Sequence, residues 1–278
     1  MGRGVSVWLL ASVLVLLLGC ATTPPPLPAA YPDELPEVWL DALESGPCVA
    51  SIDARVRLRI HPPDRAAVNL DGNLRASLPD TLRLSGKVGV FRPVFQFVTV
   101  AGYSELLLHD ARAFWIVPSD EPDWETMNPA AWRRAILWSL CPQSLLRTFR
   151  PDDRGSMSGR LWTVSGTLVG TPYAVTLDVE PKSRSVRSIR LENAGDELLT
   201  AELGDYRFLE DAWVPQRASL RIRQPDGMTE ITIELVGASN LAPGALEGKG
   251  LIQPPGWEPV FELGLSLPTD LGEEPTPK

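Results

Sequence analysis

The strongest constraint on the fold is a strict alternation of apolar and polar side chains just after residue 50. Between Ser51 and Ile60, apolar residues occupy every second position, and aspartate or arginine residues stand between them. Successive side chains of a β-strand point to opposite faces of the sheet, so this period of two predicts a strand with one dry face and one wet face. Such alternation is typical of antiparallel sheets that face water on one side.

Further strand-like runs follow on both sides of a central segment. They span residues 67–78, 81–90, 94–101, 103–109, 113–117, 161–168, 173–179, 185–192, 197–203, 214–223 and 229–236. Turn chemistry such as Asp71-Gly72 and Pro79-Asp80 accompanies them. The segment from Phe95 to Val98 is apolar on both faces, so we expect it to be covered on both. No repeat of 20 to 50 residues is apparent, which weakens a propeller interpretation.

The central segment predicts a helix. Asn128 is a good N-cap, and Pro129 suits the first helical position. Trp132, Ile136 and Leu140 then share one face. Residues 144–149 are expected to form a second short helix. A stripe of this kind covers a cavity or fills an ordinary closed core, and the pattern leaves both interpretations open.

Another short helix is predicted over residues 33–44, before the first strand. Trp39 and Leu43 lie on its apolar face, and Asp33 and Pro36 suit its start.

Composition excludes some classes of function. The 278 residues carry a formal net charge of −9, which argues against nucleic-acid binding and against broad electrostatic binding to anionic headgroups. This length suits one large all-β domain or two small ones.

The N-terminus has the order of a secretory signal, in which Arg3 precedes an apolar run from Val5 to Leu18. Its end, Leu17-Leu18-Gly19-Cys20, resembles the lipobox of bacterial lipoproteins. The resemblance implies removal of residues 1–19 and a lipid anchor on Cys20. The alternative is an ordinary cleaved signal with an incidental cysteine. Residues 20–33 then form a proline-rich tether. Ala21 and Thr22, in place of aspartate, resemble the sorting pattern for the outer membrane.

Two cysteines remain once Cys20 is assigned to lipid. Cys48 and Cys141 can pair in an oxidising compartment, and two buried free thiols are the alternative.

Catalytic and metal-binding motifs are missing from the sequence. It has 2 histidines, His61 and His109, and lacks HExxH, CxxC, P-loop, GxGxxG and GxSxG patterns. The acidic residues between Asp120 and Glu125 lack EF-hand spacing, so a solvated loop is favoured over a calcium site. We therefore expect no metal, no cofactor and no enzymatic activity.

The layout of a leading helix, strands, a helical insertion and more strands resembles the LolA/LolB-like superfamily of lipoprotein-sorting proteins. The similarity covers roughly residues 34–263 and includes the ending from Ala212-Trp213-Val214-Pro215 to Phe261. It implies a mainly β fold, an incomplete antiparallel β-barrel of about 11–12 strands with a helical lid. The domain is expected over residues 34–265, with a loose acidic, proline-rich tail over 266–278.

The resemblance also implies a cavity that receives the acyl chains of lipids or lipoproteins. The candidate lid and cavity residues are Trp39, Leu43, Phe95, Phe97, Trp132, Ile136, Leu140, Trp162 and Leu177. The implied location is the periplasmic side of the outer membrane, with a periplasmic carrier as a partner. The alternative function is a non-transport interaction or stress-sensing lipoprotein with a filled core.

Overall fold

The fold was examined in a computed structural model of the chain. The structure describes residues 48–49, 51–78, 81–90, 92–100, 102–120, 122–152, 155–183, 185–209, 212–224, 226–239, 250–251, 254–257 and 259–260. The predicted helix over 33–44, the tether, Cys20, Trp39, Leu43 and the acidic tail lie outside these residues. In the described part, no helix is both long enough and apolar enough to cross a membrane.

The molecule is built around one large sheet. Its long strands are β1 (Ser51–His61), β2 (Val68–Ser77), β3 (Thr81–Val88), β4 (Arg92–Val100), β5 (Tyr103–Leu108), β6 (Ala113–Pro118), β9 (Leu161–Leu168), β10 (Ala174–Glu180), β11 (Ser185–Asn193), β12 (Asp196–Gly204), β15 (Arg217–Gln224) and β16 (Gly227–Ser239). Shorter strands are β7 (Phe149–Pro151), β8 (Ser156–Ser158), β13 (Arg207–Leu209), β14 (Ala212–Val214) and β17 (Pro259–Val260). The 3-10 helix η1 (Pro181–Ser183) connects β10 to β11.

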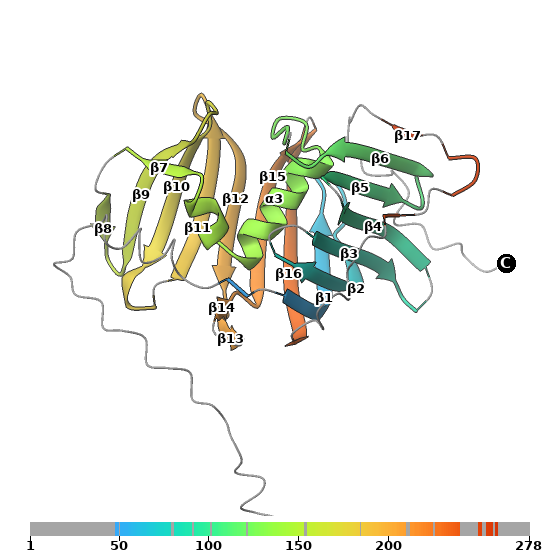
Figure 1. Ribbon diagram of the computed structural model, residues 1–278, viewed down its shortest axis with the longest axis horizontal. Coiled ribbons are helices and arrows are strands. Elements are labelled where there is room, and N and C mark those ends of the chain that lie inside the picture. Colours follow the sequence, from blue (N-terminus) through green and yellow to red (C-terminus); the bar gives the residue numbers. More distant parts are fainter. Residues whose placement is uncertain are drawn as a thin grey trace, which may run out of the picture.

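The strand order is β17-β6-β5-β4-β3-β2-β1-β16-β15-β12-β11-β10-β9-β7, and β8 also pairs with β9. The pair β13-β14 forms a separate small ribbon. Every pairing within the large sheet is antiparallel except that of β17 with β6. The two ends of the sheet do not pair with each other in the described residues, so the sheet curls without closing (Figure 1). The expected incomplete antiparallel barrel is confirmed, and the long strands agree in number with the expectation.

The pairing of β1 with β16 joins the two ends of the domain sequence. Asp53 of β1 lies opposite Ser239, and His61 lies opposite Glu230. On the other side, β1 pairs with β2 over its whole length. The first long strand therefore stands in the middle of the sheet, between β2 and β16 (Figure 1).

Asp71-Gly72 lies inside β2, although its chemistry predicted a turn. Gly72 faces Val56 on one neighbouring strand and Gly86 on the other. A Cβ atom added to Gly72 would meet the backbone oxygen of Ser85. This glycine therefore serves the close approach of two strands and does not reverse the chain.

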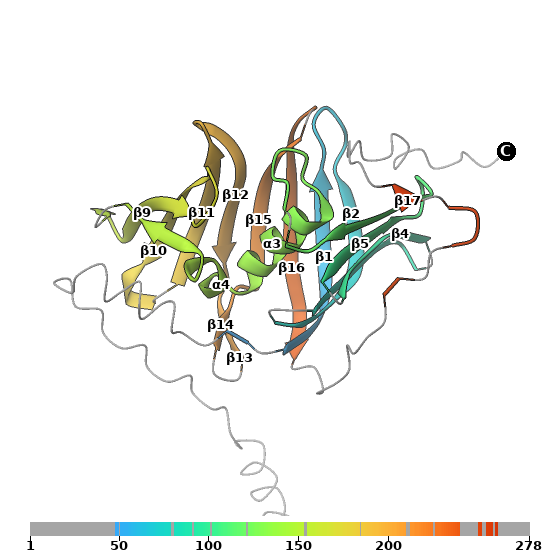
Figure 2. The same ribbon diagram turned by 45° about the horizontal axis from the view of Figure 1, so that its top comes forward.

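Two helices lie on the inner side of the curved sheet. Helix α3 (Pro129–Leu140) crosses the sheet and contacts β5, β6 and β12 (Figure 2). Helix α4 (Gln143–Leu146) follows directly. The second helix was expected over residues 144–149 and is shorter, because Phe149 already begins β7.

The alternation places apolar side chains on the inner face and charged ones outside. On β1, residues 52, 54, 56 and 58 are buried, while Arg55, Arg57 and Arg59 are exposed. On the outer face of the β15–β16 hairpin, Arg217 pairs in register with Glu234, and Arg221 with Glu230. Opposite charges across a hairpin fit a solvated face.

The outer face is covered near one edge of the sheet. There Val98, Leu107 and Phe114 are buried, although they point away from the inner face. The C-terminal segment provides contacts in this region, since Leu251 N donates to Glu105 and the ring of Trp257 meets that of His109 edge-on at 6.0 Å. The segment around Phe95–Val98 is thus covered near both faces, as its composition suggests.

Candidate functional site

The site is formed by helix α3 and the inner face of the sheet below it. The helix begins as its sequence predicts, because the Asn128 side chain accepts from Ala131 N at 2.9 Å. The same oxygen accepts from Asp123 N at 3.1 Å, which ties the preceding loop to the helix start. Pro129 occupies the first turn, where a missing N–H costs nothing.

The acidic loop before α3 is held by its own side chains. Asp123 Oδ1 accepts from Glu125 N at 3.0 Å and from Thr126 N at 3.1 Å, and Oδ2 accepts from the Thr126 hydroxyl at 2.8 Å. Glu125 Oε1 in turn accepts a hydrogen bond at 2.9 Å from the side-chain amide of Asn193, the last residue of β11. Among the described residues, no group of His, Cys, Asp and Glu side chains could hold a metal ion.

The C-terminal end of α3 is held by a disulfide and by an aromatic stack. A disulfide joins Cys141, which follows the helix, to Cys48 before β1, with Cα atoms 5.6 Å apart. This is the pair expected from the sequence. Trp138 stacks on Trp124 with ring centroids 5.0 Å apart, and both rings are buried. In the N-terminal half, Pro129 and Ala131 are buried, whereas Trp132, Arg133 and Arg134 are only partly buried.

A pair of glycines shapes the wall opposite α3. Gly72 and Gly86 lie side by side on β2 and β3, so this part of the inner face lacks side chains. The Phe95 ring of β4 lies against Gly86, where an added Cβ atom would collide with it. An aromatic ring over a strand glycine is a recurrent way to fill such a space. Here it brings Phe95 to the inner face beside Phe97.

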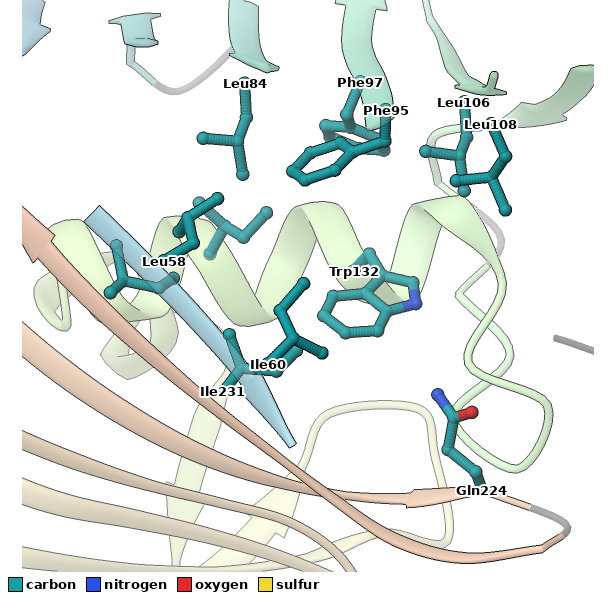
Figure 3. Close-up of a pocket in the computed structure, with 12 residues that line it drawn as sticks. Leu58, Ile60, Leu84, Phe95, Phe97, Leu106, Leu108, Trp132, Gln224 and Ile231 are labelled. Atoms are coloured by element: carbon teal, nitrogen blue, oxygen red, sulfur yellow. The ribbon is translucent and has the colours of Figure 1, made fainter. Parts of the chain in front are cut away.

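Between this wall and α3 lies a cavity of about 100 Å³. Figure 3 shows Phe95, Phe97, Leu106 and Leu108 on one side, Ile60 and Ile231 on the other, and Trp132 between them. The complete lining is Leu58, Ile60, Leu84, Phe95, Phe97, Leu106, Leu108, Trp132, Ile136, Gln224, Ile231 and Ile233. A cavity of comparable size with an apolar lining stays dry and binds small apolar molecules.

The cavity contains no charge. None of the lining residues is titratable, and Gln224 brings the one side-chain amide among them. Two arginines of the lid, Arg133 and Arg134, follow Trp132, and Arg134 donates to the backbone oxygen of Asp120 at 3.5 Å. Burial, with a smaller effect from Arg133, lowers the pKa of Arg134 from its ordinary value. The chemistry of the cavity is therefore that of an apolar binding site.

The structure brings together some of the residues expected in the site and separates others. Phe95, Phe97, Trp132 and Ile136 line the cavity together. Leu140 lines a smaller neighbouring cavity of about 10 Å³, which shares Leu84, Ile136 and Ile233 with the first.

Two expected cavity residues do not line it. Trp162 of β9 and Leu177 of β10 are buried in a packed part of the core, with exposed fractions of 6% and 0%. They were expected in the cavity because strand alternation predicts which side chains lie on the inner face. It does not predict which part of that face stays uncovered. Trp39 and Leu43 lie outside the described residues.

Sequence reasoning missed Gln224, which was assigned to the turn before Gly227. The alternation of β15 did contain the signal, since Ala218, Leu220, Ile222 and Gln224 are the inner positions and only the last is polar. The other lining residues from β1, β3, β5 and β16 also follow from the inner-face alternation, but their choice depends on where α3 lies.

The arrangement of strands and lid was compared with known structures. A LolA superfamily protein from Nitrosomonas europaea superposes with a TM-score of 0.53 at 11% identity, covering 75% of this chain and 94% of that one. This chain has the LolA-superfamily fold. A domain from Vibrio parahaemolyticus, described as an outer membrane lipoprotein-sorting protein domain, gives a TM-score of 0.50 at 10% identity, over 74% and 90% of the two chains.

The LolA-like fold is recognisable here only in three dimensions. No protein-family model matches the sequence, and no curated protein matches it either. An antiparallel sheet needs inner-face positions that are apolar, and many different residues satisfy that requirement. The fold can therefore persist at identities near 10%.

Proposed function

We propose that this protein holds acyl chains in the cavity beneath α3 and takes part in lipoprotein or lipid transfer at the outer membrane. The cavity itself carries the proposal, because its lining is apolar apart from one amide and a helix covers it. The LolA-like fold supports it, since one protein with this fold is described as an outer membrane lipoprotein-sorting domain.

Binding of a whole acyl chain requires the lid to move. The cavity measures about 100 Å³, whereas sites for larger ligands occupy roughly 300–1,000 Å³. The disulfide and the Trp124–Trp138 stack hold the C-terminal end of the lid, so displacement would involve its N-terminal half, where Trp132 and Arg134 are partly exposed although the first turn is buried. An acyl chain replaces the contacts of Trp132 and Ile136 with similar apolar contacts, so the net cost of displacement is small.

The anchor belongs to the same proposal. A lipid on Cys20 and a proline-rich tether would hold the domain beside a bilayer, with which it exchanges lipid. Transfer of this kind needs an apolar cavity and a competing membrane, and it needs no catalysis. Mass spectrometry of the N-terminal peptide tests the anchor: we expect diacylglycerol on Cys20 as the first residue, and none in a Cys20→Ser variant. An unmodified Cys20 in the exported protein would contradict the anchor without affecting the cavity.

Lipid extraction tests the cavity most directly. The full chain with Cys20→Ser, produced under oxidising conditions, is extracted with organic solvent and analysed by mass spectrometry. We expect acyl species in near-stoichiometric amount and saturable binding of a fluorescent fatty acid. An extract without acyl species, together with no saturable binding, would contradict the proposal.

Substitutions in the lid then locate the bound chain. Trp132→Glu and Ile136→Asp each place a carboxylate against the apolar wall, so we expect fluorescent fatty-acid affinity to fall at least about tenfold. Arg134→Gln, on the opposite side of the same helix, is the matched control and should bind as the wild type does. Unchanged affinity in folded Trp132→Glu protein would place the ligand elsewhere.

The alternative is an envelope interaction or stress-sensing protein with a filled core. The small volume of the cavity favours it, because a closed lid over about 100 Å³ is compatible with an ordinary packing defect. The extraction experiment separates the two functions, since only the first yields bound acyl chains.

A further inference from the structure

Gln224 is the one lining residue of the cavity whose side chain carries an amide, a group that can both donate and accept hydrogen bonds. It is the last residue of β15 and lies opposite Gly227, where the β15–β16 hairpin ends. Alternation directs it to the inner face, after Ala218, Leu220 and Ile222. Figure 3 shows its amide directed toward Trp132 at one end of the cavity.

The Gln224 side chain is largely buried, but its amide atoms keep some contact with solvent and have no hydrogen-bond partner among the described residues. The residue is 6% exposed, and within the described part of the chain no hydrogen bond joins its amide to another group. A glutamine amide can donate two hydrogen bonds and accept two. Leaving such a group unpaired in an apolar environment is unfavourable, so a buried amide normally has a partner. Apart from the Trp132 indole, the surrounding walls are made of leucine, isoleucine and phenylalanine and cannot supply one.

Trp132 adds a second hydrogen-bond donor near the same end. In Figure 3 the indole nitrogen lies on the side of Trp132 that faces away from Leu58, toward the end of the cavity where Gln224 stands. The opposite end, near Leu84 and Ile136, is apolar and adjoins the smaller cavity that reaches Leu140. The site thus has a polar end at the hairpin tip and an apolar end beneath the lid.

We infer that Gln224 binds the carbonyl group of an uncharged acyl ester or amide and so orients the acyl chain, with its head at the hairpin tip and its tail beneath α3. This inference rests on the proposed function. An uncharged carbonyl satisfies the amide donor, while the hydrocarbon tail suits the rest of the lining. A free fatty acid should bind more weakly than its ester, because no cationic side chain lines the cavity to compensate for burial of the carboxylate.

The test compares ligands that differ only in the head. Tridecane, methyl laurate and laurate compete with the uncharged fluorescent probe N-phenyl-1-naphthylamine for the full chain carrying Cys20→Ser. We expect the wild type to bind methyl laurate more tightly than tridecane. In Gln224→Leu this selectivity should fall by about 3- to 10-fold, which corresponds to the net free energy of one neutral hydrogen bond. Affinity for tridecane should stay the same or rise. Gln96→Leu, the same change on the outer face of β4, is the control and should leave the selectivity unchanged.

A spectroscopic measurement gives a second readout, which begins with the wild-type protein and does not depend on affinity. With 13C-labelled methyl laurate bound, the infrared carbonyl stretch should move to lower frequency than in alkane solvent, and Gln224→Leu should reverse most of that shift. If tridecane and methyl laurate both bind, but neither the selectivity nor the carbonyl frequency depends on Gln224, the inference is wrong and the proposed function stands. If neither tridecane nor methyl laurate displaces the probe, the proposed function itself fails.

Discussion

The two halves of the sheet have the same alternating pattern but different interiors. In the half built from β9 to β12, Val164, Leu177, Ile189 and Leu191 are 0% exposed. In the half around β3 to β5, Leu84, Leu106 and Leu108 are also buried but line an empty volume of about 100 Å³. Both halves belong to one core cluster, which also contains Trp124, Trp138 and the leucines of α4.

This difference shows that the lid and the glycine pair, and not the alternation of the strands, determine which half is hollow. The glycine pair Gly72–Gly86 removes side chains from one wall, and α3 opposes that wall mainly with Trp132 and Ile136. Where bulky indoles and α4 cover the sheet, the same kind of strand forms a filled core. The predictions below test this contrast.

The largest expected effect is a loss of stability in the packed half. Leu177→Ala removes a side chain with no exposure and should lower the free energy of unfolding by about 2–5 kcal/mol. Leu106→Ala, in the hollow half, should cost at least about 1 kcal/mol less, because one side of Leu106 already faces empty space. Urea denaturation of both variants measures the difference. Equal losses would mean that the two halves are packed alike.

The disulfide should contribute a similar amount. Cys48 and Cys141 are separated by 93 residues, so their bond restricts a long loop of the unfolded chain. Replacing both with alanine should lower the free energy of unfolding by about 2–4 kcal/mol. Reductant should destabilise the wild type by a comparable amount and leave the double variant unaffected. A wild type that is insensitive to reductant would show that the bond does not stabilise the fold.

Enlarging a leucine to phenylalanine should change the free energy of unfolding in opposite directions in the two halves. Leu106→Phe should raise the free energy of unfolding by about 0.5–2 kcal/mol and weaken fatty-acid binding, because the ring occupies the space of the ligand. Leu177→Phe should instead lower it by about 1–3 kcal/mol, since that site has no free volume. Denaturation and probe titration of this matched pair give both readouts. Stabilisation by both variants would locate free volume in the β9–β12 half as well.

The smallest effect concerns pH and the outer face near Trp257. Burial lowers the pKa of His109 below its ordinary value of 6.5, and the charge of Asp110 opposes this only in part. The folded state therefore binds this proton less readily than the unfolded state does. The contribution of His109 to stability is complete above pH 6.5 and is lost as the pH falls through the folded-state pKa.

Urea denaturation at pH 7.5 and 5.0 should therefore show a smaller pH dependence for His109→Gln than for the wild type. His61→Gln, on the exposed outer face, serves as the control. Because no titratable residue lines the cavity, binding of an uncharged ester should stay nearly constant over the same range, apart from any effect of unfolding. An affinity that falls sharply with pH while the protein stays folded would show that a charged group takes part in the site.

Much of the fold could be predicted from local pattern. The strands follow from alternation, and the start of α3 follows from Asn128 and Pro129. The errors also have local causes: Asp71-Gly72 has turn chemistry but serves a close strand contact, and Phe149 looked helical beside α4 but pairs with Leu168. Of the expected cavity residues that are described, Phe95, Phe97, Trp132 and Ile136 line the cavity, whereas Trp162 and Leu177 do not.

The sequence by itself determined which face of each strand is apolar, because a period of two is a property of the backbone and needs no partner. It also indicated the lid stripe and the cysteine pair. Only the tertiary structure decided which part of that face is left open, because this depends on where α3 crosses the sheet and on which side chains meet it. Gln224 illustrates the same point: its place at the end of β15 is local, but its burial beside Trp132 arises only when the hairpin and the lid come together.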